Sequence, residues 1–508
     1  MSSLPNNTVE RCELAPGFNI SRVLVGLWQV ADMEKGGTTL DAPETAKAML
    51  PYVEAGLTTF DMADHYGSAE EISGAFAAGF PEARAQFLTK WVPEPGASAG
   101  DPVSKNTVRQ AVERSLGRLR ADRIDLLQFH AWNYADPTWL DCLFWLQELK
   151  EEGLIGHLGL TNVDTAHLRI VLHSGIEVVS NQVCYSLLDR RPGGAMTELC
   201  ADHDVKLLCY GTVAGGLLTE PWLGAPDPDP EVLTWSQMKY RRFIEQAGGW
   251  SAHQRLLAAV RAVAERRGVS MANVACRYVL EQPAVGGIII GARLGESEHI
   301  ADNTRLLNWE LDEQVRAELE KAAAQLTDIP GDCGDEYRRP PYLTASGDLS
   351  HHLESLPVPY VPERLSDERT RVSSGTVWED IAGFSRAVRH GDRIYVSGTT
   401  ATQGTRTIGG SDAEAQTHFV IDKVEGAIQS LGGRLEDVVR TRIFLHEPDQ
   451  WEAVSRVHGS RFRHVQPANT LVHAGLIGDG YLVEMEAEAV VSDAFEGSTA
   501  DVRDEGTS

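Results

Sequence analysis

The chain has 508 residues, with 73 acidic against 46 basic side chains, which gives a formal net charge of −27 with histidine neutral. Hydrophobic residues make up 42% of the sequence and charged residues 23%, a composition typical of a folded protein rather than a disordered one. The excess of negative charge argues against nucleic acid and anionic membranes as partners, because both bind basic surfaces.

Other absences narrow the class of protein further. No apolar run is long enough to span a bilayer, and the first residues lack the apolar core of a signal peptide. The seven cysteines are scattered singly, without the paired spacing of a disulfide framework or a metal site. We therefore expect a soluble, cytoplasmic protein of two or three domains without a bound metal.

From about residue 22 to residue 292, short β-branched runs alternate with stretches of helical periodicity. Eight strands that alternate with helices over this length predict an α/β fold, a closed (β/α)8 TIM barrel. A doubly wound open sheet is the alternative, but it usually carries a GxGxxG turn, and the sequence has none. The predicted strands are Val23–Trp28, Thr58–Met62, Gln86–Trp91, Ile124–His130, Ile155–Thr161, Val178–Tyr185, Lys206–Tyr210 and Gly286–Ile290.

The remaining sequence predicts a second, smaller unit. Residues 1–328 form the barrel domain, residues 329–374 are rich in Pro and Gly and predict a linker, and residues 375–493 predict a small α+β domain. The tail, residues 494–508, is acidic and predicts disorder. Within the small domain the expected strands are Ala387–Ser397, Val438–Leu445 and Leu482–Val491, and the expected helices, covering one face of the sheet, are Ala413–Leu431 and Gln450–Arg463.

Titratable residues gather at the predicted carboxyl ends of the barrel strands, where (β/α)8 barrels carry their functional side chains. Asp61 and Tyr66 follow the second strand, Lys90 lies at the end of the third, and His130 ends the fourth. Pairing of Asp61 with Lys90 would lower the cost of burying either charge. A tyrosine beside an ammonium group can donate a proton near working pH, and a neutral histidine can orient a substrate oxygen. Each residue taken alone also fits a structural ion pair or a buried hydrogen bond.

These residues resemble the aldo/keto reductase family over roughly residues 10–328. The motifs that carry the resemblance are Asp61 with Tyr66-Gly67, Thr89-Lys90, His130, Thr161-Asn162, Gln182 with Tyr185, Tyr210, and Gly291-Ala292-Arg293. The resemblance implies that Tyr66 is the general acid, assisted by Lys90 and Asp61, and that His130 positions the carbonyl. It also implies a bound nicotinamide cofactor, held by Thr161, Asn162, Gln182, Tyr210, Gly211, Thr212, Gly215, Leu217, Gly291, Arg293 and Asn303.

Arg293 bears on the choice of cofactor. A planar guanidinium grips phosphate oxygens in bidentate fashion, so an arginine at the adenosine end favours NADPH over NADH. Three tryptophans, Trp28, Trp91 and Trp132, follow strand ends at the same rim. They predict either core packing or the wall of an apolar substrate pocket.

The C-terminal region resembles the Rid/YjgF family, whose members form trimers of a chorismate-mutase-like fold. The matching segments include Gly383–Val388, Ile394–Gly398, Pro467-Ala468 and Val483–Ala487. Imine-hydrolysing members place an arginine after the Pro-Ala pair, but this chain has Asn469, which cannot supply that charge. Glu484 corresponds to the family's cleft glutamate, although an acid on this alternating strand also fits a solvent-facing position.

Together the patterns predict an NADP-dependent aldo/keto reductase that reduces an aldehyde or ketone, fused to a Rid-like domain that trimerises or handles an imine or enamine. A small-molecule carbonyl or imine is the expected substrate. Three alternatives remain at this stage: a cyclic-imine reductase, a non-catalytic sensor that binds NADPH, and a protein whose C-terminal domain is the enzyme.

Overall fold

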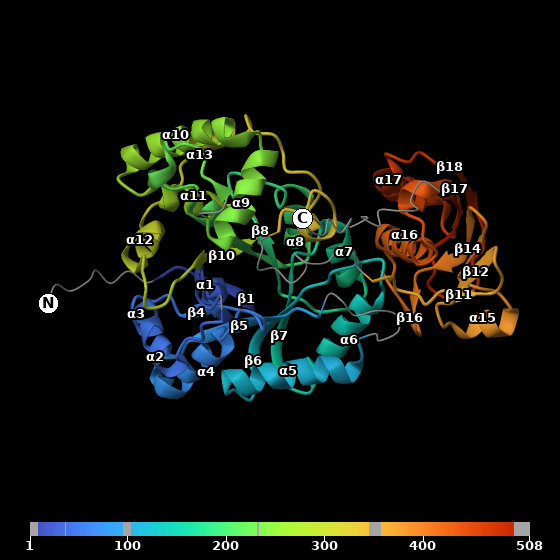
Figure 1. Cartoon of the computed structure of the whole chain (residues 1–508), viewed down its shortest axis with the longest axis horizontal. Coiled ribbons are helices and arrows are strands. Elements are labelled where there is room, and N and C mark those ends of the chain that lie inside the picture. Colours follow the sequence, from blue (N-terminus) through green and yellow to red (C-terminus); the bar gives the residue numbers. More distant parts are fainter. Residues whose placement is uncertain (1–8, 36, 95–102, 231–232, 345–356, 492–508) are drawn as a thin grey trace, which may run out of the picture.

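The structure is a computed structural model that describes the chain except for residues 1–8, 36, 95–102, 231–232, 345–356 and 492–508. The predicted acidic tail lies outside the described residues. A large barrel domain and a smaller domain lie side by side (Figure 1). Among the helices that the structure describes, none combines the length and apolar character of a transmembrane segment.

The barrel closes through eight parallel strands in the order β10-β3-β4-β5-β6-β7-β8-β9. This confirms the predicted (β/α)8 barrel, and each predicted strand overlaps an observed one. The strands are β3 (Val23–Gly26), β4 (Thr59–Asp61), β5 (Gln86–Trp91), β6 (Ile124–Phe129), β7 (Ile155–Thr161), β8 (Ser180–Cys184), β9 (Lys206–Tyr210) and β10 (Val285–Gly291).

Helices surround this barrel and bury their apolar faces against the strands. Their starts carry conventional caps: the Ser104 hydroxyl accepts from the Thr107 amide, and the Asp164 carboxylate accepts from the His167 amide. The helices of the barrel domain are α1 (Trp28–Met33), α2 (Ala42–Ala46), α3 (Leu50–Glu54), α4 (Ala69–Gly79), α5 (Lys105–Leu119), α6 (Thr138–Glu151), α7 (Thr165–His173), α8 (Ala195–Asp202), α9 (Trp235–Gln246), α10 (Gly249–Arg267), α11 (Met271–Leu280), α12 (Ile300–Arg305) and α13 (Glu313–Ala323).

An antiparallel hairpin, β1 (Arg11–Ala15) and β2 (Phe18–Ser21), precedes the barrel. Leu14 and Ile20 pack against the inward-facing leucines Leu24, Leu88 and Leu126. The hairpin therefore covers the end of the barrel opposite the strand carboxyl termini, and the sequence analysis did not predict it.

Part of the segment predicted as a linker packs against the barrel mouth. Residues 329–344 include the short helix α14 (Asp335–Arg338), whose Glu336 is buried and paired with Arg191. We call residues 333–343 the strap, because they cross the mouth of the barrel, where Arg338 donates to the carbonyl oxygens of Ala131 and Asn162.

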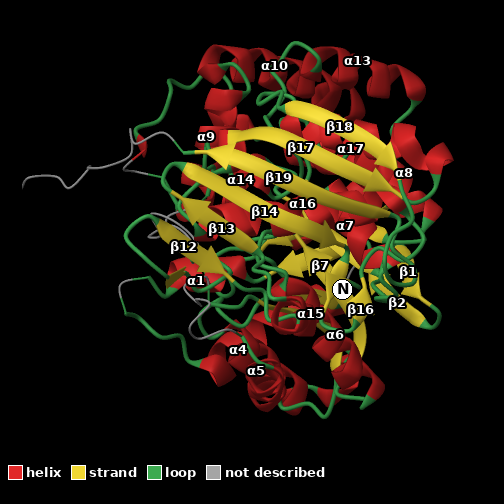
Figure 2. Ribbon diagram, turned by 90° about the vertical axis from the view of Figure 1, so that its right-hand side faces the viewer, coloured by secondary structure: helices red, strands yellow, loops and turns green. Residues whose placement is uncertain are grey.

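The smaller domain has helices on one face of a sheet, as the sequence predicted, but the sheet has seven strands where three were expected, and the predicted strand Ala387–Ser397 is a hairpin of two strands. Figure 2 shows the open face of this sheet toward the viewer with α16 behind it. The parallel edge strand β18 was not predicted, because its residues are mostly exposed and do not alternate. The strands are β11 (Glu363–Arg364), β12 (Arg369–Val372), β13 (Ala387–His390), β14 (Arg393–Thr400), β17 (Val438–Leu445), β18 (Ala468–His473) and β19 (Val483–Val490), with a separate pair, β15 (Thr402–Gln403) and β16 (Arg406–Thr407). The helices are α15 (Val377–Ala382), α16 (Ala413–Ser430) and α17 (Trp451–Phe462).

The two domains meet where α16 packs against α7 (Figure 1). Gly426 of α16 faces the Ala135 carbonyl so closely that an added Cβ would lie 2.4 Å from its oxygen. Two polar contacts flank this approach: Arg169 pairs with Asp412 at 2.7 Å, and Gln403 donates to Asp141 at 2.6 Å. The interface is therefore close-packed.

Candidate active site at the barrel mouth

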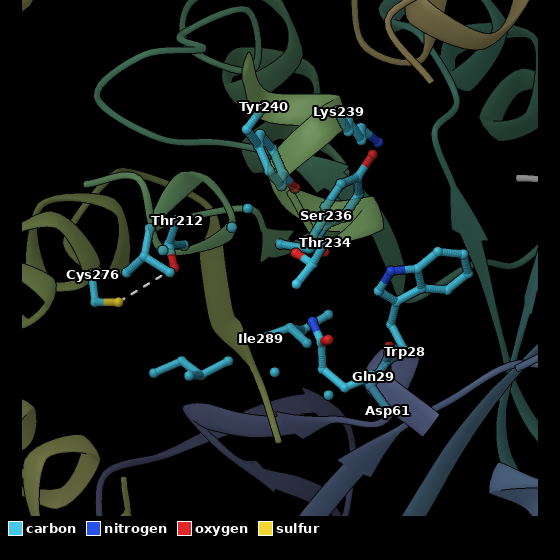
Figure 3. Close-up of a pocket in the computed structure, with 18 of the residues that line it drawn as sticks. Trp28, Gln29, Asp61, Thr212, Thr234, Ser236, Lys239, Tyr240, Cys276 and Ile289 are labelled. Carbon is cyan, nitrogen blue, oxygen red and sulfur yellow. Dashed lines mark hydrogen bonds between the residues drawn. The ribbon is translucent and has the colours of Figure 1, made fainter. Parts of the chain in front are cut away.

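A cavity of about 700 Å³ opens at the carboxyl ends of the barrel strands. The four predicted catalytic residues, Asp61, Tyr66, Lys90 and His130, all line it. Figure 3 shows part of this cavity, with Lys239 of α9 across from Asp61.

Lys90 and Asp61 form a buried ion pair on adjacent strands. The Lys90 ammonium donates to an Asp61 carboxylate oxygen at 2.6 Å and to the Met62 carbonyl at 2.8 Å. Burial lowers the pKa of Lys90, and the Asp61 charge opposes that shift. The same ammonium lies 4.9 Å from the centroid of the Tyr66 ring. The structure therefore brings the predicted acid, cation and carboxylate together at one rim.

His130 is buried and neutral at pH 7. Burial holds its pKa well below the ordinary value, and the Arg338 cation adds to the effect. Its Nδ1 lies 3.3 Å from the Thr161 carbonyl oxygen, a long contact, while Nε2 has no hydrogen-bond partner among the described residues. A buried nitrogen without a partner, in the wall of a cavity, is suited to receive a ligand group.

The residues predicted to hold the nicotinamide also line the cavity: Thr161, Asn162, Gln182 and Tyr210. The Tyr210 hydroxyl donates to the Asn162 side chain at 2.7 Å. The Gln182 amide donates to Asp61 at 2.7 Å, so this residue also supports the ion pair.

The loop after β9 brings its backbone to the cavity. Gly211 and Gly215 have positive φ values of 73° and 63°. A Cβ at Gly211 would lie 2.3 Å from the Tyr240 hydroxyl, which leaves room only for glycine. Thr212 lines the cavity, but Leu217 does not: its side chain is fully buried in the core and its carbonyl accepts from His253. The Leu217 side chain therefore packs in the core, and the predicted cofactor contact of this residue remains a prediction for its backbone.

Gly291, Arg293 and Asn303 line the cavity at its far end. Arg293 already pairs with Asp32 at 2.8 Å and with Glu296 at 2.7 Å. A cavity of this volume, lined by close-approach glycines and by a buried histidine nitrogen without a hydrogen-bond partner among the described residues, fits a nicotinamide dinucleotide.

Two of the three predicted pocket tryptophans reach the cavity. Trp28 meets the Tyr66 ring edge-on at 4.9 Å, and Trp132 meets the His130 ring at 4.3 Å. Trp91 is not among the lining residues and packs against Phe129 at 5.5 Å. Successive side chains on a strand point to opposite faces, so Trp91 must point away from the barrel interior when Lys90 points into it.

Lys239 on α9 and Tyr337 in the strap are among the lining residues that sequence reasoning missed. Lys239 lies on the amphipathic helix α9, where a lysine among regularly spaced apolar residues gives no sign of a functional role. Tyr337 lies in a segment whose apolar residues follow no helix or strand period. A tyrosine between two charged residues inside a Pro- and Gly-rich run was the single signal available.

The Rid-like residues do not meet within one chain. Asn469 on β18 donates to Thr441 at 2.9 Å, whereas Glu484 on β19 lies opposite Phe444. The two positions are two strands apart and about 10 Å apart along the strands. Burial raises the pKa of Glu484, with a further contribution from Glu486.

The family model described as the Aldo/keto reductase family matches residues 22–324, more than half of the chain. The chain belongs to the aldo/keto reductase family. A second model, described as Endoribonuclease L-PSP, matches residues 377–491, and this region forms the predicted Rid/YjgF-type α+β domain.

Relatives of the reductase domain include an NADH-specific methylglyoxal reductase of Escherichia coli, 30% identical over 40% of this chain and 66% of that protein. The solved structure of a glycerol dehydrogenase from Gluconobacter oxydans has the same fold: it is 22% identical, with a TM-score of 0.51, over 64% of this chain and 98% of that one. A YjgF/YER057c/UK114 family member from Mycobacterium tuberculosis is 41% identical, with a TM-score of 0.23, over 24% of this chain and 99% of that one. The barrel is thus an oxidoreductase domain of a carbonyl-reducing family.

Proposed function

We propose that this reductase uses NADPH to reduce an aldehyde or ketone and that Tyr66 donates the proton to the carbonyl oxygen. The observation that carries the proposal is the convergence of Tyr66, Lys90, Asp61 and His130 on one cavity, with the buried Lys90 ammonium 4.9 Å from the Tyr66 ring.

The role of Lys90 follows from the charge that develops on Tyr66. When a phenol gives up its proton, an adjacent cation stabilises the resulting phenolate and makes proton donation easier. Lys90 must stay protonated to act in this way, although burial favours its neutral form. The Asp61 carboxylate, itself held by Gln182, keeps the lysine charged and directed at the rim.

His130 orients the substrate in this proposal. A carbonyl oxygen only accepts hydrogen bonds, so it binds to Nε2 when that nitrogen carries the proton. In the other tautomer Nδ1 carries the proton and donates to the Thr161 carbonyl over 3.3 Å, a long and therefore weak hydrogen bond whose loss costs little free energy. Trp28 and Trp132 form apolar walls beside this position.

When bound, NADPH would supply the hydride. Thr161, Asn162 and Tyr210 would hold its nicotinamide, Gly211 and Gly215 would let the pyrophosphate approach the backbone, and Arg293 would grip the 2′-phosphate. NADH is the competing cofactor on two grounds: Arg293 is already paired with Asp32, and one relative is NADH-specific by name.

The test compares wild type with Tyr66→Phe across a panel of aldehydes, ketones and cyclic imines, each with NADPH and with NADH. We expect kcat for the best carbonyl to fall by about 100- to 10,000-fold, the range for loss of a general acid, while cofactor binding persists. Tyr342→Phe, an exposed tyrosine, is the matched control. Turnover of imines alone would favour an imine reductase, and cofactor binding without any turnover would favour a sensor.

For the Rid-like domain we propose trimerisation through the open face of its sheet, with the handling of an imine or enamine as a further role. No helix of the described chain covers this face (Figure 2), and it exposes the apolar residues Tyr395, Val439 and Val472. The separation of Asn469 from Glu484 within one chain supports a cleft completed by another subunit.

A further inference from the structure

We propose that Lys239 and Tyr337 bind a carboxylate of the substrate, so that the reductase acts on carbonyl compounds that carry an acidic group. The inference rests on the proposed function, because it places the carboxylate opposite the residues that hold the carbonyl.

The strap fixes Tyr337 at the substrate end of the cavity. On one side Glu336 pairs with Arg191 at 2.9 Å, with both side chains buried. On the other side Arg338 donates to the Asn162 carbonyl at 2.7 Å. Tyr337 is therefore held between two anchored neighbours.

Tyr337 faces the residues that would receive the carbonyl. Its ring meets the His130 ring edge-on at 5.5 Å and the Trp132 ring at 6.4 Å. Its hydroxyl lies 3.5 Å from the Tyr210 hydroxyl. A small substrate bound at His130 would thus contact Tyr337.

Lys239 brings a cation to the same place. Its ammonium donates to the Tyr337 hydroxyl at 2.5 Å and lies 5.0 Å from the centroid of the Tyr210 ring. The side chain is almost fully buried, with 6% of its surface exposed, yet it lines the cavity. The nearby Glu336 carboxylate offsets part of the cost of burying this ammonium, and a substrate carboxylate in the cavity would place a second anion beside it. The geometry repeats that of Lys90 and Tyr66 on the other side of the cavity.

The charges around this position favour an anion. Burial acts to raise the pKa of the Glu336 carboxyl, but Arg191 and Lys239 hold it below its usual value. Arg338 adds another cation close enough to depress the pKa of His130.

The cavity's own carboxylates are engaged elsewhere. Asp61 is paired with Lys90, Glu220 accepts from the Met271 amide, and Asp302 accepts from Ser270 and Asn273. A substrate carboxylate at this position would accept hydrogen bonds from the Lys239 ammonium and the Tyr337 hydroxyl.

The experiment uses two matched pairs of probes on the full chain. Turnover is measured with 4-carboxybenzaldehyde and its methyl ester, and binding is measured with the corresponding alcohols by quenching of tryptophan fluorescence. We expect the wild type to prefer the acid of each pair. Lys239→Met should lower the acid-to-ester ratio of kcat/KM, and that of affinity, by about tenfold or more. This is the factor expected for the loss of one hydrogen bond to a charged group. Lys239→Arg should keep the preference, and Lys321→Met, on the exposed face of α13, should leave the ratio at the wild-type value.

Each outcome decides between the two proposals. Reduction of both aldehydes with the same ratio in wild type and Lys239→Met would overturn the carboxylate site and leave the proposed function standing. Binding of the acid that depends on Lys239, without turnover of any carbonyl, would support the site and refute the reductase proposal. A loss of NADPH affinity in Lys239→Met with an unchanged acid-to-ester ratio would assign the lysine to the cofactor and overturn the inference.

Discussion

The interface between the domains contains a buried row of alternating charges, and Asp422→Ala would break it. Asp422 on α16 accepts from His167 Nε2 at 3.0 Å and from Arg461 at 2.6 Å. His167 Nδ1 in turn contacts the Asp164 carboxylate at 2.6 Å. Asp422 and His167 are each 2% exposed at their side chains, so solvent does not screen the row.

The expected loss of stability follows from what the substitution leaves behind. Removing one partner of a buried ion pair costs about 3–5 kcal/mol, because the remaining charge is uncompensated. Here Arg461 keeps Glu425 at 2.8 Å and His167 keeps Asp164, so both cations retain one anion. We therefore expect the free energy of unfolding to fall by about 3 kcal/mol, the lower end of that range.

The effect should depend on pH through His167. Burial acts to lower the pKa of His167, but Asp164 and Asp422 together raise it above the ordinary value. A group with a raised pKa stabilises the fold fully below its unfolded pKa, about 6.5, and loses that contribution as the pH rises through its folded pKa. Arg461 and His167 hold the pKa of Asp422 low against the effect of burial, so its contribution is present above about pH 4 and is lost as the pH falls through the lowered value. The difference between wild type and variant should therefore be largest between about pH 4 and 6.5 and should shrink at alkaline pH.

Urea unfolding followed by tryptophan fluorescence, at several pH values, measures this difference. Glu452→Ala removes an exposed acid from α17 and should change stability by no more than about 0.5 kcal/mol. An Asp422→Ala variant as stable as this control would refute the idea that the row holds the domains together. If Asp422→Ala lowered the free energy of unfolding by about 3 kcal/mol to the same extent at every pH, His167 would carry no charge in the folded protein.

Two further predictions concern the cofactor and the assembly. Arg293→Met should raise KM for NADPH about tenfold or more and change KM for NADH little, because only NADPH carries the 2′-phosphate. Equal changes in both KM values, measured by steady-state kinetics, would contradict the role assigned to Arg293. Tyr395→Asp places a charge on the open face of the sheet and should convert trimers to monomers in light scattering, and a wild-type chain that is already monomeric would refute the proposed interface.

The barrel and the titratable residues at its rim were predictable because both depend on local sequence patterns. Most of the barrel strands are short, largely apolar runs, and inward-facing residues near their carboxyl ends reach the mouth whatever the loops do. Asp61, Lys90 and His130 could therefore be grouped from strand order alone, and the structure brings them together. Trp91 takes the first of the two roles expected of the tryptophans, core packing, because the alternation along β5 turns it away from the interior when Lys90 points inward. Trp28 and Trp132 lie beyond their strand ends and line the cavity.

The strap was not predictable in the same way. Its residues follow no helix or strand period, and their partners lie far away in the sequence: Arg191 for Glu336, and Asn162 for Arg338. A Pro- and Gly-rich composition is shared by linkers and by segments that pack through individual side chains. Only the three-dimensional structure distinguishes the two, and it places Tyr337 in the cavity.

The strap also links the substrate cavity to the second domain. The Arg338 guanidinium lies 4.3 Å from the centroid of the Tyr134 ring, and that ring stacks on His167 with centroids 3.4 Å apart. His167 contacts Asp422 of the smaller domain, so a continuous column of packed groups runs from α16 to the residue next to Tyr337. No described residue of the smaller domain lines the cavity, and its contact with the cavity wall is indirect, through His167, Tyr134 and Arg338. In a chain that lacked this domain, His167 would face solvent and would keep only Asp164 of its two carboxylate partners. The fusion therefore has a structural consequence for the reductase domain, whether or not the second domain is itself a catalyst.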